Sequence, residues 1–166
     1  MERVRAVIAG LDISTRMIAL VVLNAQDATI ARRDEFPIPE ISKLANKSKA
    51  ERCRVVATTG LAEALSGVTT VYVEQPMGRQ IKGIAEVERV VGAVIANIPD
   101  PCAVSLITPG EWKKSAGLNG NANKEAIALR AVGLYPSLDG SSQDILDAAM
   151  IARACWEEGE KQWHLS

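Results

Sequence analysis

The sequence predicts an α/β fold in which helices cover a mixed central sheet of about five strands. Two observations predict it. Two apolar, β-rich segments and a third, amphipathic strand segment follow one another with short connections near the N-terminus, and strands then alternate with helices. Short connections favour an antiparallel meander, whereas a strand, helix, strand alternation favours parallel pairing. We therefore expect antiparallel strands first, parallel strands later, and a single domain over residues 1–166.

Composition and charge limit the class of protein. The chain has 166 residues, of which 48% are hydrophobic, and a formal net charge of -1. Nucleic-acid binding would therefore depend on a local basic patch. No apolar stretch approaches the roughly 20 residues that span a bilayer, and Met1 to Arg5 lacks the apolar core of a signal peptide. We expect a cytoplasmic protein with no membrane segment.

Cysteine and histidine usage excludes several kinds of site. Cys53, Cys102 and Cys155 are far apart and lie in apolar surroundings, which favours reduced thiols over disulfides or zinc ligands. His164 is the single histidine, and we expect it on the surface. Histidine-based triads and histidine metal clusters are therefore not expected.

The first segment, Arg5 to Thr15 (RAVIAGLDIST), is an apolar run that predicts a strand buried on both faces. Asp12 interrupts it. An unpartnered carboxylate there would cost on the order of several kcal/mol, so it must be protonated, hydrogen-bonded, or facing a cation or cleft. Alternatively, Asp12 ends the strand and caps its own turn, with help from Ser14 and Thr15.

Two more strands and a helix follow. Met17 to Leu23 and Ala28 to Phe36 are predicted strands, the second ending before Pro37. Ser48 and Glu51 have the capping-box pattern of a helix. Its apolar positions keep helical spacing, at Cys53, Val56, Ala57, Leu61, Ala64 and Leu65. Its basic residues either contact a phosphate backbone or form a solvated face: Lys43, Lys47, Lys49, Arg52 and Arg54.

The middle of the chain predicts a strand, a helix and a second strand. Val71 to Val73 is a short strand that ends in Glu74, which repeats the pattern at Asp12. The helix after it has a buried stripe formed by Ile84, Val87, Val91, Val94, Ile95 and Ile98, and prolines end it. Ala103 to Ile107 is the next predicted strand.

The segment Thr108 to Lys124 (TPGEWKKSAGLNGNANK) combines a short helical turn, which carries Trp112, Lys113 and Lys114, with a loop rich in glycine and asparagine. Asn123 can cap a helix that begins at Lys124. The amides of that helix end and the lysine ammonium would favour an anion such as phosphate. An ordinary loop with solvated lysines explains the segment equally well.

The last predicted helix, Gln143 to about Trp156, is apolar around most of its circumference and should be buried on most sides. Asp144 and Asp147 lie one turn apart on one face. Two like charges about 4 Å apart repel by roughly 4 kcal/mol at an effective dielectric of 20, which favours a cation or a shared proton between them. The helix macrodipole is an alternative explanation for Asp144, but it explains Asp147 less well.

The acids that interrupt apolar elements are Asp12, Glu74, Asp144 and Asp147. They meet at one point if the two strands are neighbours and the last helix packs over the strand ends. Hard oxygen ligands select Mg²⁺, with Mn²⁺ as a substitute. Two such ions roughly 3.5–4 Å apart support in-line displacement at phosphorus, and nearby lysines stabilise the charge that develops on the phosphate.

Four segments together resemble the RuvC family of Holliday junction resolvases, in order and spacing and over nearly the whole chain: GLDIST, VYVEQPMG, TPGEWKK with NANKE, and SQDILDAAMIA. The resemblance implies an RNase H-like fold and a homodimer that cuts four-way DNA junctions with magnesium. It implies that the metal-binding, catalytic carboxylates are Asp12, Glu74, Asp144 and Asp147. It further implies that Lys113 and Lys124 are active-site lysines. The segment Ile81 to Ile98 is similar to the family's dimer-forming helix, although its apolar stripe is equally explained as core.

Two positions depart from the family pattern. The proline and glycine that cellular members carry after the catalytic aspartate are absent here. Met77 stands where those members place an aromatic residue near the DNA bases, and this weakens a stacking contribution of roughly 1–3 kcal/mol per base. Such divergence in a compact chain resembles a phage or mobile-element member acting in a bacterial cell.

The leading hypothesis is a magnesium-dependent crossover junction endodeoxyribonuclease that leaves 5′-phosphate and 3′-hydroxyl ends. We expect DNA contacts from Met77 and from the basic residues Arg79, Lys82, Lys113, Lys114, Lys124 and Arg130. The alternatives are a nuclease for other branched DNA or RNA/DNA hybrids, and a non-catalytic branched-DNA-binding module. A phosphotransferase of the actin and sugar-kinase fold would need a second such domain. A helicase or recombination partner is not identifiable from these motifs.

Overall fold

The structure is a computed structural model that describes residues 7–14, 16–39, 41–77 and 83–163. The N-terminal residues examined for a signal peptide and His164 lie outside the described residues. The described residues form five strands: β1 (Val7–Ile13), β2 (Met17–Asn24), β3 (Ile30–Pro37), β4 (Thr70–Glu74) and β5 (Ala103–Ile107).

The strands form one sheet in the order β3-β2-β1-β4-β5. Strand β1 pairs antiparallel with β2, and β2 pairs antiparallel with β3, as expected from their short connections. Strands β1, β4 and β5 run parallel to one another. The predicted mixed sheet, antiparallel first and parallel later, is confirmed.

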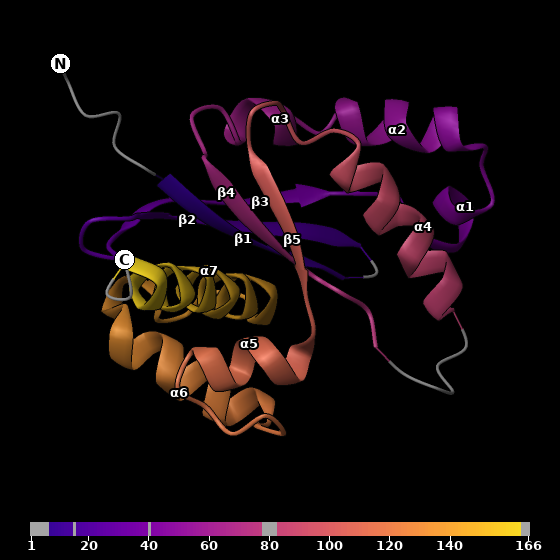
Figure 1. The fold of residues 1–166 in the computed structure, drawn as a ribbon. Coiled ribbons are helices and arrows are strands. Elements are labelled where there is room, and N and C mark those ends of the chain that lie inside the picture. The colour runs from indigo at the N-terminus through magenta and orange to yellow at the C-terminus, as the bar shows by residue number, and fades with distance from the viewer. Residues whose placement is uncertain (1–6, 15, 40, 78–82, 164–166) are drawn as a thin grey trace, which may run out of the picture.

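Helices cover both faces of the sheet (Figure 1). One layer contains α1 (Ile41–Ala45), α2 (Lys49–Ala57), α3 (Leu61–Ala64) and α4 (Ile84–Ile95). The other contains α5 (Pro109–Ser115), α6 (Lys124–Leu134), the short 3₁₀ helix η1 (Pro136–Leu138) and α7 (Gln143–Trp163). None of the helices in the described ranges is long and apolar enough to cross a membrane.

Several predicted boundaries were wrong, each for a local reason. The single helix expected up to Leu65 is two helices, because Gly60 adopts a left-handed backbone with φ 85° between them. The capping box of Ser48 and Glu51 is present. Strand β3 begins after Ala28, which occupies a tight turn with φ 55°, and it includes Pro37. Because β3 is an edge strand, the missing N–H of a terminal proline costs no pairing inside the sheet.

The later helices also differ in extent from their predictions. Helix α4 ends at Ile95, before the prolines, so Ile98 lies beyond it. Helix α7 continues to Trp163 instead of ending near Trp156. The three cysteines are free thiols, as predicted. Burial raises the pKa of Cys155 to about 12.

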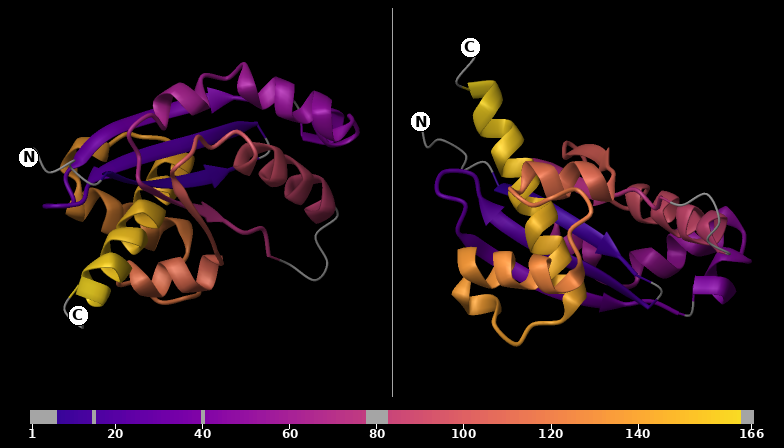
Figure 2. Two further views of the ribbon diagram at one scale, coloured as in Figure 1. Left: turned by 45° about the horizontal axis from the view of Figure 1, so that its top comes forward. Right: turned by 90° about the horizontal axis from the view of Figure 1, so that it is seen from below.

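Strand alternation divides the core between the two faces. Ala9 and Leu11 of β1 pack against the α1–α4 layer, whereas Ile8 packs against α5–α7. Gly10 and Asp12 follow Ile8 at steps of two, so they share the α7 side. Helix α7 runs diagonally across the strands on that side (Figure 2) and contacts β1, β2 and β4.

The contact between α7 and β1 is closest at Gly10. A β-carbon built on Gly10 would lie 2.3 Å from Ala148 O and 2.3 Å from Ala152 N. Only a residue without a side chain permits this approach. Asp12 is the next residue of β1 on the α7 side, and Asp144 is one helical turn before Ala148, so the crossing brings the start of α7 toward Asp12.

Candidate active site

Asp12 is the one charged side chain that is buried in the described part of the chain, with 8% of its surface exposed. It lies near the end of β1, opposite Ala19 of β2. Ser14, and not Asp12, closes the hairpin that follows, because Ser14 N donates to Met17 O at 2.9 Å. The interpretation of Asp12 as a turn cap is therefore not needed to explain this hairpin.

Glu74 ends the neighbouring strand β4. The parallel register pairs Leu11 with Val73, and its continuation brings Glu74 beside Asp12. Tyr72 packs on the α7 side of the sheet, so Glu74, two residues later, faces the same side. The carboxyl ends of two adjacent parallel strands thus carry one carboxylate each toward α7.

Asp144 and Asp147 belong to the first turns of α7. Ser142 begins this helix, since its Oγ accepts a hydrogen bond from Ile145 N at 3.2 Å and its hydroxyl donates to Glu35 of β3. Asp147 Oδ1 accepts a hydrogen bond of 2.7 Å from Gln143 Nε2, one turn earlier. These bonds anchor the helix end that carries both aspartates to the sheet.

Charge interactions link all four acids. Burial raises the pKa of Asp12 well above its usual range, and the charges of Glu74, Asp147 and Asp144 raise it further. Burial also raises the pKa of Glu74, although a hydrogen bond from Trp112 opposes the increase. The pKa of Asp147 is raised by burial and by Asp144, against the hydrogen bond from Gln143. The structure brings the four predicted acids into one electrostatically coupled group.

The donor chemistry of this group fits a hard divalent cation. All four side chains offer carboxylate oxygens, which Mg²⁺ and Mn²⁺ prefer, and a cation would offset their mutual repulsion. Among the described residues, no three or more His, Cys, Asp or Glu side chains are arranged so that together they could hold a metal ion. Two of the acids are instead hydrogen-bonded to Trp112 and Gln143. Their role as metal ligands stays a prediction.

Both predicted active-site lysines lie beside these acids. Lys113 of α5 is half-buried, and its Nζ donates to Ala122 O at 2.9 Å. Its positive charge opposes the increase in the pKa of both Glu74 and Asp147. Lys124 begins α6, and its positive charge also opposes the increase in the pKa of Asp147. The α6 start is capped as predicted, because Asn123 Oδ1 accepts from Ala126 N at 2.9 Å.

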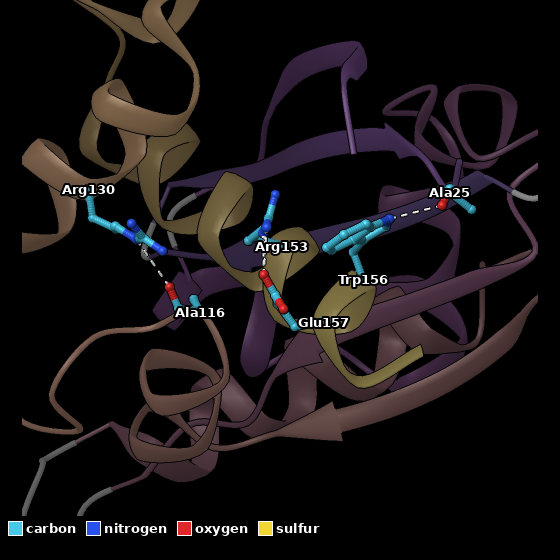
Figure 3. A network of polar contacts seen from close by, with 6 residues as sticks. All are labelled: Ala25, Ala116, Arg130, Arg153, Trp156 and Glu157. Atoms are coloured by element: carbon cyan, nitrogen blue, oxygen red, sulfur yellow. Dashed lines mark hydrogen bonds and ion pairs between the residues drawn. The ribbon is translucent and has the colours of Figure 1, made fainter. Parts of the chain in front are cut away.

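The other predicted DNA contacts are distributed differently. Met77 is 57% exposed just beyond Glu74, and Lys114 is exposed on the last turn of α5. Arg79 and Lys82 lie outside the described residues. Arg130 donates to Ala116 O at 3.3 Å, so part of its guanidinium joins α6 to the end of α5 (Figure 3).

The basic residues near α1 and α2 belong to the layer on the opposite face of the sheet from α7. Arg52 donates to Lys47 O and to Ala45 O, so it stabilises the turn between these helices. The exposed members of this group are Lys43, Lys47, Lys49 and Arg54.

Two contacts at the site were not predicted. Trp112 Nε1 donates a 2.5 Å hydrogen bond to Glu74 Oε2, and Glu35 accepts a hydrogen bond from Ser142 at the start of α7. The sequence identified Trp112 only as a residue of a helical turn. These partners are 38 and 107 residues apart, so no local spacing indicates either pair.

The fold is shared with solved structures of junction resolvases. The Thermus thermophilus RuvC structure matches with 21% sequence identity and a TM-score of 0.69, over 94% of this chain and 96% of that one. T. thermophilus RuvC in complex with Holliday junction substrate matches with 19% identity and a TM-score of 0.70, with the same coverage. Fowlpox virus resolvase in complex with substrate Holliday junction DNA matches with 11% identity and a TM-score of 0.53, over 92% and 97% of the two chains.

The sequence matches none of the protein-family models and none of the curated proteins with which it was compared. At these identities the structural matches establish the fold. The predicted RNase H-like fold, with its five-stranded mixed sheet between helices, is therefore confirmed, and so is its resemblance to RuvC.

Proposed function

We propose that this chain is a crossover junction endodeoxyribonuclease that resolves four-way DNA junctions by two-metal-ion hydrolysis, leaving 5′-phosphate and 3′-hydroxyl ends. One observation carries the proposal. Asp12 and Glu74, near the ends of their strands, are electrostatically coupled to Asp144 and Asp147 at the start of α7, in a fold shared with a resolvase solved on its junction. Fold alone does not specify an activity, whereas one buried and three half-buried acids with adjacent lysines suit phosphodiester chemistry.

The four carboxylates would hold the metal ions. Bound Mg²⁺ would activate the attacking water and stabilise the leaving oxygen of the phosphodiester. The chain itself supplies the placement: β1 and β4 fix Asp12 and Glu74 on the rigid sheet, and the Gly10 contact fixes α7 above them. A site built on such elements preserves its geometry better than one built on loops.

Lys113 and Lys124 would stabilise the negative charge on the phosphate that is cleaved. Lys113 is held by its bond to Ala122 O and its ammonium lies 5.5 Å from the Trp112 ring centroid, so its charge is oriented before DNA binds. An oriented cation stabilises negative charge that develops on a phosphate more effectively than a solvated one. Lys124 adds its charge at the N-terminus of α6, where the backbone amides also favour an anion.

The wider DNA surface and the assembly are also proposals. Lys114 follows Lys113 and Met77 lies three residues after Glu74, and both are exposed. Lys114 suits a contact to the phosphate backbone and Met77 a contact to a base. Resolution of a junction needs two cuts, so we propose a homodimer with one site per subunit, acting on DNA in the cytoplasm. Light scattering of the protein with and without a junction measures this stoichiometry.

The decisive test is cleavage of a synthetic four-way junction, a linear duplex and an RNA/DNA hybrid, with Mg²⁺ or EDTA. Wild-type protein is compared with Asp12→Asn, which keeps the side-chain size but removes the charge. Paired, symmetric, magnesium-dependent nicks in the junction alone, lost in the variant while binding survives, support the proposal. Cleavage that favours the hybrid or another branched DNA would mean that this nucleic acid, and not the four-way junction, is the substrate. Junction binding without any cleavage, with Mg²⁺ or Mn²⁺, would leave a non-catalytic binding module.

A further inference from the structure

Trp112 occupies an unusual place for a core tryptophan. Its side chain is 1% exposed and belongs to the core between the sheet and α5–α7. Its indole N–H donates a 2.5 Å hydrogen bond to Glu74 Oε2. A buried indole N–H requires an acceptor, and here that acceptor is one of the four site carboxylates.

The helix that carries Trp112 is fixed in place. Thr108 and Glu111 form a capping box at the start of α5, with Glu111 N donating to Thr108 Oγ1 at 3.4 Å. At the other end, Ser115 Oγ donates to Glu158 of α7 at 2.9 Å, and Glu158 also accepts a hydrogen bond from Tyr72 of β4. Helix α5 is thus joined to α7 and to the strand that ends in Glu74.

We propose that Trp112 is a positioning residue that orients Glu74 for cation binding. This inference rests on the proposed metal-dependent function. The indole engages Oε2, so Oε1 is the oxygen of Glu74 that would remain for a cation. As an uncharged donor without a lone pair for a metal, the indole cannot replace the carboxylate as a ligand or compete for the cation.

The size of the expected effect follows from comparable sites. Side chains that hydrogen-bond to metal ligands change metal affinity or activity by about 10–100-fold when they are removed. The bond at Trp112 is charge-assisted when Glu74 is ionised, and it lies where water does not compete for the indole. Without it, the Glu74 side chain gains rotamers that point away from the other acids.

The test is the affinity of the intact protein for Mn²⁺, measured by calorimetry without DNA, for wild type, Trp112→Phe and Trp156→Phe. Trp112→Phe retains an aromatic ring but removes the donor. Trp156→Phe is the matched control, because its indole donates instead to Ala25 O at 2.9 Å (Figure 3). Ala25 follows the end of β2 that pairs with Val7, at the opposite end of β1 from Asp12. Thermal unfolding of each variant separates loss of metal affinity from loss of the fold.

We expect Mn²⁺ affinity to fall by about 10-fold or more in Trp112→Phe and to stay at the wild-type value in Trp156→Phe. Equal affinity in all three folded proteins would overturn the role of Trp112. If Trp112→Phe does not fold, site-specific replacement of Trp112 by benzothienylalanine keeps the bicyclic shape without the N–H, and the same two results decide the question.

Failure of this inference and failure of the proposed function have different signatures. A wild-type protein that cleaves junctions, with unchanged Mn²⁺ affinity after loss of the indole N–H, retains its function while Trp112 is reduced to a packing residue. A wild-type protein that binds Mn²⁺ but cuts no nucleic acid loses the proposed function, and the role of Trp112 is still decided by the affinities. A wild-type protein that binds no Mn²⁺ overturns both.

Discussion

The backbone of Ala152 in α7 lies against Gly10 in β1 so closely that a β-carbon on Gly10 would be 2.3 Å from Ala152 N. Real β-carbons do not approach a backbone atom to this distance, so helix and strand are in direct main-chain contact. The contact fixes the height of α7 above the sheet. It thereby also sets how near Asp144 and Asp147 come to Asp12.

Gly10→Ala should therefore be strongly destabilising. The methyl group would meet backbone atoms of Ala148 and Ala152, which cannot rotate away, so we expect a loss of about 3 kcal/mol or more in the free energy of unfolding. The control is Gly133→Ala in α6, where nothing lies within 4 Å, and where alanine should add up to about 1 kcal/mol. Urea unfolding of both variants measures the difference, and equal stability would mean that α7 can lift from β1 at no cost.

Asp12→Asn should stabilise the metal-free protein. Burial and three neighbouring acids raise the pKa of Asp12, so folding favours its protonated form. An acid with a raised folded-state pKa contributes most stability below its unfolded pKa of about 3.9, and this contribution is lost as pH rises through the folded pKa. Neutral asparagine avoids the loss. We expect its Tm at pH 7 to rise by roughly 2–4 °C for each kcal/mol of penalty removed.

The pH profile and magnesium provide the checks on this prediction. Without metal, the Tm of wild type should increase as pH falls from 8 toward 5, and this increase should be smaller in Asp12→Asn. Magnesium should raise the Tm of wild type more at pH 8 than at pH 6, because protons compete for the same carboxylates. A variant less stable than wild type at pH 7 without metal would contradict the electrostatic account.

Ser142→Ala should weaken the site through the start of α7. Loss of the hydroxyl removes the bond to Ile145 N and the link to Glu35 of β3, so we expect about 1 kcal/mol less stability and slower junction cleavage. Ser48→Ala removes the equivalent cap of α2 in the opposite layer, at a similar cost in stability. Single-turnover cleavage should slow only in Ser142→Ala, and equal rates would show that the cap stabilises without positioning the aspartates.

The sequence predicted the sheet well because its signals are local. Strand alternation and short connections separated the antiparallel from the parallel strands, and caps at Ser48 and Asn123 marked two helix starts. The break at Gly60 was missed because the apolar spacing continues across it. A left-handed glycine is invisible to a periodicity that ignores backbone angles.

The candidate site was predictable to the same extent: its local sequence signals were visible, and its tertiary contacts were not. Acids that interrupt apolar elements were recognisable one at a time, since each is an exception within its own segment. The bond between Trp112 and Glu74 depends on how α5 packs beneath the sheet, and nothing near either residue in the sequence indicates it. The closeness of α7 to Gly10 likewise arises from tertiary packing.

Lys113 and Lys114 should separate catalysis from DNA binding. Lys113 is half-buried, donates a hydrogen bond to Ala122 O, and interacts electrostatically with Glu74 and Asp147. Lys114, at the next position of α5, is exposed. We expect Lys113→Ala to reduce the cleavage rate at saturating junction by about 10²–10³-fold, as for removal of one oriented charge donor. Lys114→Ala should leave that rate unchanged and reduce the slope of log affinity against log salt by about 1. If Lys113→Ala instead changes only the affinity and its salt slope, both lysines are backbone contacts, and the charge that stabilises the phosphate must come from Lys124.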